Sequence, residues 1–176
     1  MGNEAMKDYA QNMGSEKLLE KVYKRAFDYE SEKGGCSQCV LAALKEIGIV
    51  TEDTFKAGDA LAGGIALTGN GACGALSGGV MAISYCFGRD YNNFVEYESF
   101  ATFEIAKKLY DNFIEEYGSC ICKDIQKKIF GRSFNFWDPR EYEELIKAGG
   151  RKDKCPDVVG KAARWTVEII LQHSKE

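Results

Sequence analysis

The stretch CGALSGGVMAIS, Cys73–Ser84, has the composition of a tightly packed helix. Gly74 and Gly78 lie four residues apart, with Gly79 next to them, so small residues share one part of the helix surface. Glycine inside a helix costs about 1 kcal/mol relative to alanine. Several glycines together therefore indicate that another backbone, or a site beside Cys73, approaches this helix closely. Small residues at this spacing favour tight packing, either within a helical bundle or across a dimer.

Helical patterns occur on both sides of this segment. Apolar residues recur at helical spacing after Ser15, and Asp138 followed by Pro139 has the pattern of a helix N-terminus. The predicted helices cover about residues 15–33, 37–46, 51–67, 74–87, 96–118, 139–148 and 156–173. No pair of strands is apparent. The sequence predicts an all-α, single-domain helical bundle of about six or seven helices over residues 15–176, after a polar N-terminal arm at residues 1–14.

Composition narrows the classes of function. The chain has 176 residues, of which 45% are hydrophobic and 28% are charged, as in a globular domain with a true core. A net charge of -4 provides no basic field for phosphates, which argues against nucleic acid as a partner. No apolar run reaches the roughly 20 residues of a membrane span, and the N-terminus lacks the apolar core of a signal peptide. We therefore expect a cytoplasmic protein.

The cysteine content is informative for a protein in a reducing compartment. Seven cysteines, an odd number, do not predict a permanent disulfide framework there. They are better interpreted as catalytic, redox-cycling, metal-bound or buried thiols. The single histidine, His173, is near the C-terminal end, which argues against zinc sites with several histidines and against most histidine-assisted nucleophiles.

The loop GNGACG, Gly69–Gly74, formally matches the dinucleotide-binding fingerprint. A nucleotide site would also need a preceding strand and a βαβ context, and the chain offers only GIALT as a candidate strand. We therefore favour a tight turn into a helix. The free amides at such a helix start favour a nearby anion, so Gly71 and Gly74 are the candidate cofactor-binding residues of this loop.

Four cysteines lie at or near predicted helix boundaries in four separate segments. These are Cys36, Cys73, Cys122 and Cys155. Cys36 and Cys73 each follow glycines and precede a helix, where the positive end of the helix dipole lowers a thiol pKa. The sequence therefore predicts low-pKa thiolates at these two positions. It also predicts that the side chains of all four cysteines can converge at one end of a bundle.

At these residues the sequence resembles the C_GCAxxG_C_C family of redox-active proteins. The central motif reads Cys73-Gly74-Ala75-Leu76-Ser77-Gly78, with Cys before Gly where the family name has Gly before Cys. The other family cysteines match Cys36, Cys122 and Cys155, and the resemblance covers about residues 18–172. It implies a small helical protein that works in redox chemistry, without an established substrate.

Three functions remain open on the sequence alone. In the first, the four cysteines are catalytic and exchange disulfides with an unknown redox partner protein or small-molecule substrate; Cys36 with Cys73 and Cys122 with Cys155 are plausible pairs. This function requires no cofactor. In the second, the same four thiolates bind zinc or an iron–sulfur cluster, although their spacing contains no zinc-knuckle signature. In the third, a non-enzymatic bundle binds a ligand or a partner, and a homodimer is possible.

The remaining three cysteines have less defined roles. Cys86 lies within the glycine-rich helix and is expected to be a small buried hydrophobe. Cys39 follows Cys36 by three residues and occupies an apolar-face position, where it either packs in the core or resolves a disulfide. Cys120 is two residues from Cys122, a spacing that would strain a direct disulfide.

Overall fold

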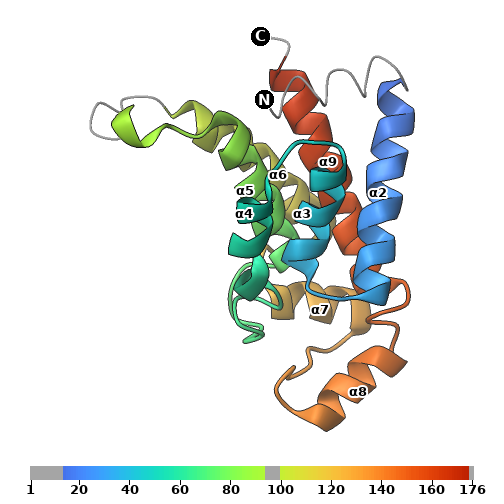
Figure 1. Cartoon of the computed structure of the whole chain (residues 1–176). Coiled ribbons are helices and arrows are strands. Elements are labelled where there is room, and N and C mark those ends of the chain that lie inside the picture. The colour runs from blue at the N-terminus through green and yellow to red at the C-terminus, as the bar shows by residue number, and fades with distance from the viewer. Residues whose placement is uncertain (1–13, 94–99, 175–176) are drawn as a thin grey trace.

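Helices form the regular structure of the protein in a computed structural model that describes residues 14–93 and 100–174 (Figure 1). The elements are α2 (Ser15–Glu32), α3 (Cys36–Glu46), α4 (Glu52–Ala57), η1 (Asp59–Leu61), α5 (Gly74–Phe87), η2 (Tyr91–Asn93), α6 (Ala101–Tyr117), α7 (Cys122–Phe130), α8 (Pro139–Lys147) and α9 (Lys154–His173). Within the described residues there is no strand, only an isolated antiparallel bridge between Ala72 and Ile121. The all-α prediction is confirmed, with eight α-helices in this part of the chain.

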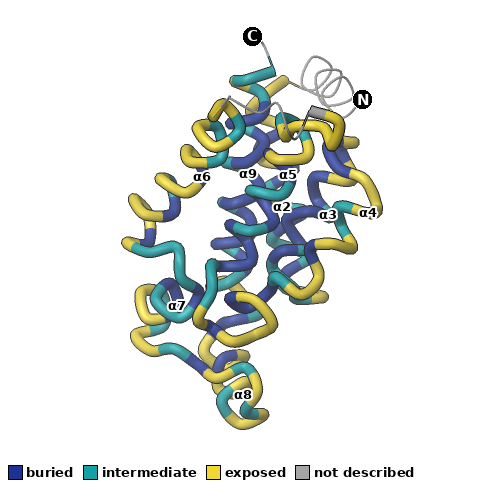
Figure 2. Tube along the Cα trace, turned by 90° about the vertical axis from the view of Figure 1, so that its left-hand side faces the viewer, coloured by how far each residue is buried: buried dark blue, intermediate teal, exposed yellow. Residues whose placement is uncertain are grey.

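The last helix, α9, is the centre of the bundle. It lies against α2, α3, α5 and α6 (Figure 1). Its residues Val159, Ala163, Val167 and Ile170 are spaced three or four apart and are at most 1% exposed. Figure 2 shows that buried residues follow these central helices, whereas most of α8, at one end of the bundle, is exposed. The core therefore surrounds α9, and α8 is a peripheral element.

The glycines of α5 allow this helix to approach its neighbours within the same chain. A Cβ atom added to Gly78 would lie 2.5 Å from the backbone oxygen of Ser37 in α3. A Cβ atom on Gly79 would lie 2.5 Å from a methyl carbon of Leu109 in α6. Real Cβ atoms are not found at such distances. The expected close packing is confirmed, and the structure assigns it to helices of one subunit.

Most helix ends follow the sequence signals. The side chain of Asp138 accepts a hydrogen bond from the backbone N–H of Arg140, and Pro139 is the first residue of α8, as predicted. Gly118 ends α6 in the left-handed conformation with φ 75°. At the start of α3, Gly35 has φ 85°, which aims the chain back along the bundle after α2.

The predicted helix at 51–67 is wrong beyond Ala57. The chain instead continues through η1 into a left-handed turn at residues 63–67, in which Ile65, Ala66 and Leu67 all have positive φ values. This conformation costs roughly 1–2 kcal/mol for each non-glycine residue. Tertiary contacts hold it there: a Cβ atom on Gly64 would lie 2.9 Å from both the Gly69 backbone and the Cβ of Cys122. The apolar spacing of this segment does not encode that close approach.

Other differences are smaller. The sequence analysis did not predict α7, and α9 begins two residues before Pro156. Proline is tolerated in the first turn of a helix because its missing N–H has no partner there. The predicted polar arm and the first residues of the 96–118 helix lie mainly outside the described residues. No helix in the described part of the chain has the length and apolar character needed to cross a bilayer.

Candidate functional site

The four predicted site cysteines line one cavity of about 100 Å³. Cys36 is the first residue of α3, Cys73 is the N-cap of α5, Cys122 begins α7, and Cys155 is the second residue of α9. The N-terminal ends of four helices therefore meet at the cavity. The structure brings together residues that are up to 119 positions apart in the sequence, as expected from their positions at helix boundaries.

Backbone hydrogen bonds hold Cys73 and Cys122 beside each other. The N–H of Cys73 donates to the carbonyl of Cys120 at 2.8 Å, and the N–H of Cys122 donates to the carbonyl of Gly71 at 3.0 Å. The N–H of Lys123 adds a third bond, to the carbonyl of Gly69, at 2.9 Å. These bonds connect the glycine loop to the start of α7 on either side of the Ala72–Ile121 bridge. They fix the two cysteines on the cavity wall without a disulfide.

The glycines of this loop have packing roles. A Cβ atom on Gly74 would collide with the Sγ of Cys36 and would lie 2.9 Å from the Cα of Ala62. Gly71 donates its N–H to the carbonyl of Gly64 at 3.0 Å and accepts the bond from Cys122. The loop thus lets Cys36 approach the start of α5. The strand that a dinucleotide site would need is absent from the described residues, where GIALT forms the left-handed turn instead.

The prediction of a low-pKa thiolate at Cys36 is wrong. The thiol of Cys73 interacts with Cys36 and raises the pKa of Cys36 well above its ordinary value; burial and the charge of Glu30 act in the same direction. Only the backbone N–H of Gly63 lowers this pKa. The helix dipole is too weak to offset the loss of water around the sulfur. In this structure Cys36 is therefore a neutral thiol at neutral pH.

The other two cavity thiols are also held in the neutral form. Burial raises the pKa of Cys122 to about 12, and the neighbouring Cys36 adds to this shift. Burial raises the pKa of Cys155 well above its ordinary value, with further contributions from Glu30, Cys36 and Cys122. Cys36 disfavours ionisation of both Cys122 and Cys155, and Cys122 disfavours that of Cys155, so the cavity accommodates little negative charge.

Glu30, near the C-terminal end of α2, lines the same cavity and was missed by the sequence analysis. Its side chain is 6% exposed, and its Oε2 atom has no hydrogen-bond partner. Burial raises the pKa of Glu30 to about 7, although Cys39 and Arg151 act in the opposite direction. A signal was present in the sequence, because Glu30 follows the apolar residue Ala26 by four positions and so shares its helix face.

Arg151 provides the positive charge at this end of the cavity. Its Nε atom donates to the carbonyl oxygen of Glu30 at 2.7 Å, and a terminal nitrogen donates to the carbonyl of Ser31 at 3.2 Å. A guanidinium group at a helix C-terminus is favoured by the helix dipole and satisfies carbonyls that have no partner within the helix. Arg151 therefore joins the chain before α9 to the end of α2 and closes this side of the site.

Gln126 connects α7 to the loop at residues 131–138. It is 2% exposed, its Oε1 atom accepts a hydrogen bond from the backbone N–H of Phe134 at 2.8 Å, and its Nε2 atom donates to the Sγ of Cys122 at 3.5 Å. This second bond lowers the pKa of Cys122 against the larger effect of burial. The sequence analysis also missed Gln126, which lines the cavity together with Cys122.

Replacing Gln126 by leucine should lower the free energy of unfolding by about 1–3 kcal/mol, because the buried N–H of Phe134 would lose its acceptor. Urea denaturation followed by circular dichroism measures this change. The control is Gln172→Leu on the exposed side of α9, for which we expect a change within about 0.5 kcal/mol. Equal stabilities of the two variants would contradict the role assigned to Gln126.

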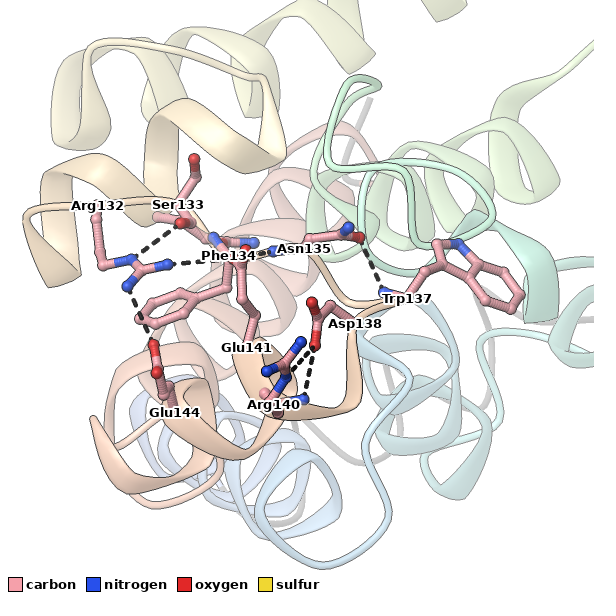
Figure 3. A network of polar contacts seen from close by, with 10 residues as sticks. Arg132, Ser133, Phe134, Asn135, Trp137, Asp138, Arg140, Glu141 and Glu144 are labelled. Carbon is pink, nitrogen blue, oxygen red and sulfur yellow. Dashed lines mark hydrogen bonds and ion pairs between the residues drawn. The ribbon is translucent and has the colours of Figure 1, made fainter.

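The loop at residues 131–138 and α8 form the outer side of the cavity. Arg132 forms ion pairs with Glu141 and Glu144, both at 3.1 Å, and these pairs hold the loop on α8 (Figure 3). The indole nitrogen of Trp137 donates to the carbonyl of Ala66 at 3.1 Å, which joins this loop to the left-handed turn. Between these two segments, the outer cavity wall is apolar and contains Leu67, Phe136, Tyr142 and Leu145.

The remaining cysteines do not line this cavity. Cys39 is 3% exposed in the core, and its Sγ donates to the carbonyl of Gly34 at 3.2 Å. Cys86 is half-buried near the opposite end of α5, where it packs against the core, and burial raises its pKa to about 11. Cys120 is also half-buried. The four cysteines of the predicted site thus line the cavity, and the other three do not.

All seven cysteines are free thiols in this structure. Among the described residues, no group of three or more histidine, cysteine, aspartate or glutamate side chains has the arrangement needed to hold a metal ion. The donor set that would fit zinc or an iron–sulfur cluster is nevertheless the four cavity cysteines, because both take thiolate ligands. Binding would require these sulfurs to move and to lose their protons.

A family model described as "Putative redox-active protein (C_GCAxxG_C_C)" matches residues 35–169. The chain belongs to this family. The part that matches the C_GCAxxG_C_C family contains all four cavity cysteines, and Arg151, but begins after Glu30. Neither the curated proteins nor the solved structures include a match to the chain.

Proposed function

We propose that this protein is a dithiol–disulfide redox protein in which Cys36 and Cys73 form the first redox pair. The observation that supports this most directly is the position of the four cysteines around one cavity, with Cys73 near enough to Cys36 to raise the pKa of the Cys36 thiol. The family assignment agrees with a redox role. Cys122 and Cys155 line the same cavity, where they can exchange with this pair or form a second one.

In the forward reaction, Cys36 and Cys73 lose two protons and two electrons to an acceptor, and a bond forms between their sulfurs. In the return reaction, a thiolate of a small-molecule dithiol attacks the Cys73 sulfur, so that the Cys36–Cys73 bond breaks and Cys36 takes up a proton and leaves as a thiol. The second thiolate of the reductant attacks its own mixed-disulfide sulfur and releases Cys73. The reductant ends as a disulfide, and both protons are on the protein thiols.

The environment of the cavity is consistent with this cycle. The reduced thiols and the disulfide are all uncharged, whereas a thiolate is disfavoured by the burial that raises the pKa of Cys36 and Cys155. The apolar wall therefore tolerates both end states and disfavours the charged intermediate. Such a site reacts slowly unless a nearby group accepts the proton of the attacking thiol.

The test is a stepwise oxidation of protein purified without oxygen. Thiols are counted with a chromogenic reagent after addition of diamide, an azo compound that takes up two electrons and two protons from a pair of thiols. We expect thiols to disappear two at a time, and peptide mass spectrometry should identify Cys36–Cys73 as the first disulfide. Random loss of single thiols, or a first disulfide between cysteines outside the cavity, would contradict the proposal.

The same preparation tests the competing assignment of the four cysteines to a metal. Iron with acid-labile sulfide and visible absorption would indicate a cluster, and one tightly bound zinc per chain would indicate a structural site. Either result at full occupancy would replace the dithiol–disulfide proposal, because thiolates bound to a metal are not available for exchange. Metal-free protein whose thiols do not form pairs would leave a non-enzymatic binding module.

A further inference from the structure

Glu30 differs from the acidic residues of the protein surface. It is the only carboxylate among the described residues that line the cavity, and it is 6% exposed. Its Oε2 atom is buried and has no partner. The thiol of Cys39 interacts with the Glu30 carboxylate and lowers its pKa, but a buried carboxylate oxygen without a hydrogen-bond donor is costly, so its presence requires an explanation. Within this cavity, a free carboxylate oxygen can accept a proton from a thiol or a hydrogen bond from a small ligand.

The size of the cavity restricts what can react there. A volume of about 100 Å³ holds a few water-sized molecules. Pockets for drug-sized ligands are larger, at roughly 300–1,000 Å³. A tripeptide disulfide therefore does not fit inside, and neither does a loop of a partner protein. Leu67 and Phe136 line the outer wall, and the bond from Trp137 to Ala66 joins the two segments that carry them.

We propose that the cavity is the reaction site for hydrogen peroxide, or another hydroperoxide of similar size, with Cys36 as the attacking thiol and Glu30 as the acid–base residue. This rests on the proposed dithiol function and specifies its electron acceptor. A neutral acceptor of two electrons that is little larger than water suits a small cavity that disfavours charge.

The reaction balances with the groups present. Glu30 accepts the proton of Cys36, and the thiolate attacks one peroxide oxygen, so that an S–O bond forms and the O–O bond breaks. Glu30 returns the proton to the departing hydroxide, which leaves as water. Cys73 then attacks the Cys36 sulfur, the S–O bond breaks, and the hydroxyl group leaves as a second water with the Cys73 proton. Two thiols and one peroxide thus become one disulfide and two waters.

The charges around Glu30 suit this exchange. The groups that act on it or share its end of the cavity are Cys36 and Cys39 on α3, Cys122 on α7, Cys155 on α9 and the guanidinium of Arg151. Burial raises the pKa of Glu30 to about 7, which is the range in which an acid–base group works in both directions at neutral pH. Moving a proton from Cys36 to Glu30 shifts the negative charge within the cavity without adding to it.

The first experiment compares oxidants of different size in single-turnover reactions of the full chain. Rapid acid quenching and mass spectrometry follow formation of the Cys36–Cys73 disulfide. We expect hydrogen peroxide to react about tenfold or more faster than either cumene hydroperoxide or diamide, because both bulky compounds collide with the cavity wall and oxidise the pair only slowly. Phe136→Ala, which widens the outer wall, should reduce this preference. Equal rates for the two hydroperoxides in the native protein would overturn the proposal.

The second experiment replaces Glu30 by glutamine, with Glu32→Gln on the exposed face of the same helix as the control. We expect the peroxide reaction of the Glu30 variant to slow by about 100-fold and to lose its pH dependence near neutrality. Loss of the charge alone would not slow the reaction. Removing the negative charge of Glu30 lowers the pKa of Cys36, so alkylation of Cys36 by iodoacetamide should not be slower in this variant. A peroxide rate equal to that of the control would overturn the proposal.

The two proposals fail in different ways. If diamide forms the Cys36–Cys73 disulfide while peroxide shows neither a size preference nor a dependence on Glu30, the dithiol function stands and the peroxide reaction is refuted. If no oxidant forms a disulfide within the cavity, both are refuted. Circular dichroism spectra and thermal melting of each variant show that any loss of rate is measured on folded protein.

Discussion

Cys36→Ser and Cys73→Ser should each stop formation of the first disulfide, with a loss in the two-thiol oxidation rate of at least about 100-fold. Each variant removes one sulfur of the proposed pair, in which Cys73 raises the pKa of Cys36. The double variant should be no slower than either single variant, because residues that act as one unit do not contribute additively. The measurement is loss of thiol pairs after addition of diamide.

Three further variants test whether the effect is specific to Cys36 and Cys73. Cys122→Ser and Cys155→Ser should leave the first disulfide intact and should remove the second pair of thiols from the titration. Cys86→Ser is the matched control, because Cys86 is on the same helix as the Cys73 site but 13 residues further along, about 20 Å at the rise of an α-helix. A Cys36→Ser variant that still loses its first thiol pair at the native rate would contradict the assignment of Cys36 and Cys73.

Gly78→Ala should lower the free energy of unfolding by about 2 kcal/mol. Alanine gains about 1 kcal/mol over glycine in helix propensity, whereas overpacking a close contact costs about 1–3 kcal/mol. The overpacking term should reach its upper range here, because the new Cβ would meet backbone atoms of Ser37 at 2.5, 3.1 and 3.2 Å. A backbone cannot rotate away as a side chain can, so α3 and α5 would have to separate.

Urea denaturation of Gly78→Ala measures this loss, with Ser84→Ala on the exposed face of α5 as the control. The control changes only helix propensity and should raise stability by a few tenths of a kcal/mol. The variant should also alter the cavity, because α3 carries Cys36 and α5 begins beside Cys73. A Gly78→Ala protein as stable as its control would show that α3 and α5 can move apart at little cost.

Much of the fold is encoded in local sequence signals. Asp138 and Pro139 specify the start of α8, Gly118 specifies the end of α6, and the glycines of α5 predict its close packing. These predictions are confirmed because each depends on the conformational preferences of a few adjacent residues. The left-handed turn at residues 63–67 could not be predicted in this way, since its non-glycine residues locally disfavour the conformation that tertiary contacts impose.

The candidate site likewise has features that the sequence predicts and features that only the structure shows. The four cavity cysteines are recognisable because each lies at a helix boundary next to a glycine or a proline, or in a family motif. The ionisation state of Cys36 cannot be recognised from the sequence. The helix dipole that favours a thiolate is a local effect, whereas the burial that opposes it is a property of the assembled cavity. Glu30 and Gln126 appear in the sequence as ordinary polar residues of helices, and only their burial beside the cysteines gives them a role.

The sequence by itself determined that this protein is an all-α bundle with four cysteines at or near helix boundaries, because helix periodicity, caps and glycine spacing act over a few residues. Only the tertiary structure decided that these cysteines surround one small cavity with a buried carboxylate, and that the thiols of Cys36, Cys122 and Cys155 are neutral. Burial and the distances between segments far apart in the chain depend on how all helices pack together, and no short stretch of sequence carries that information.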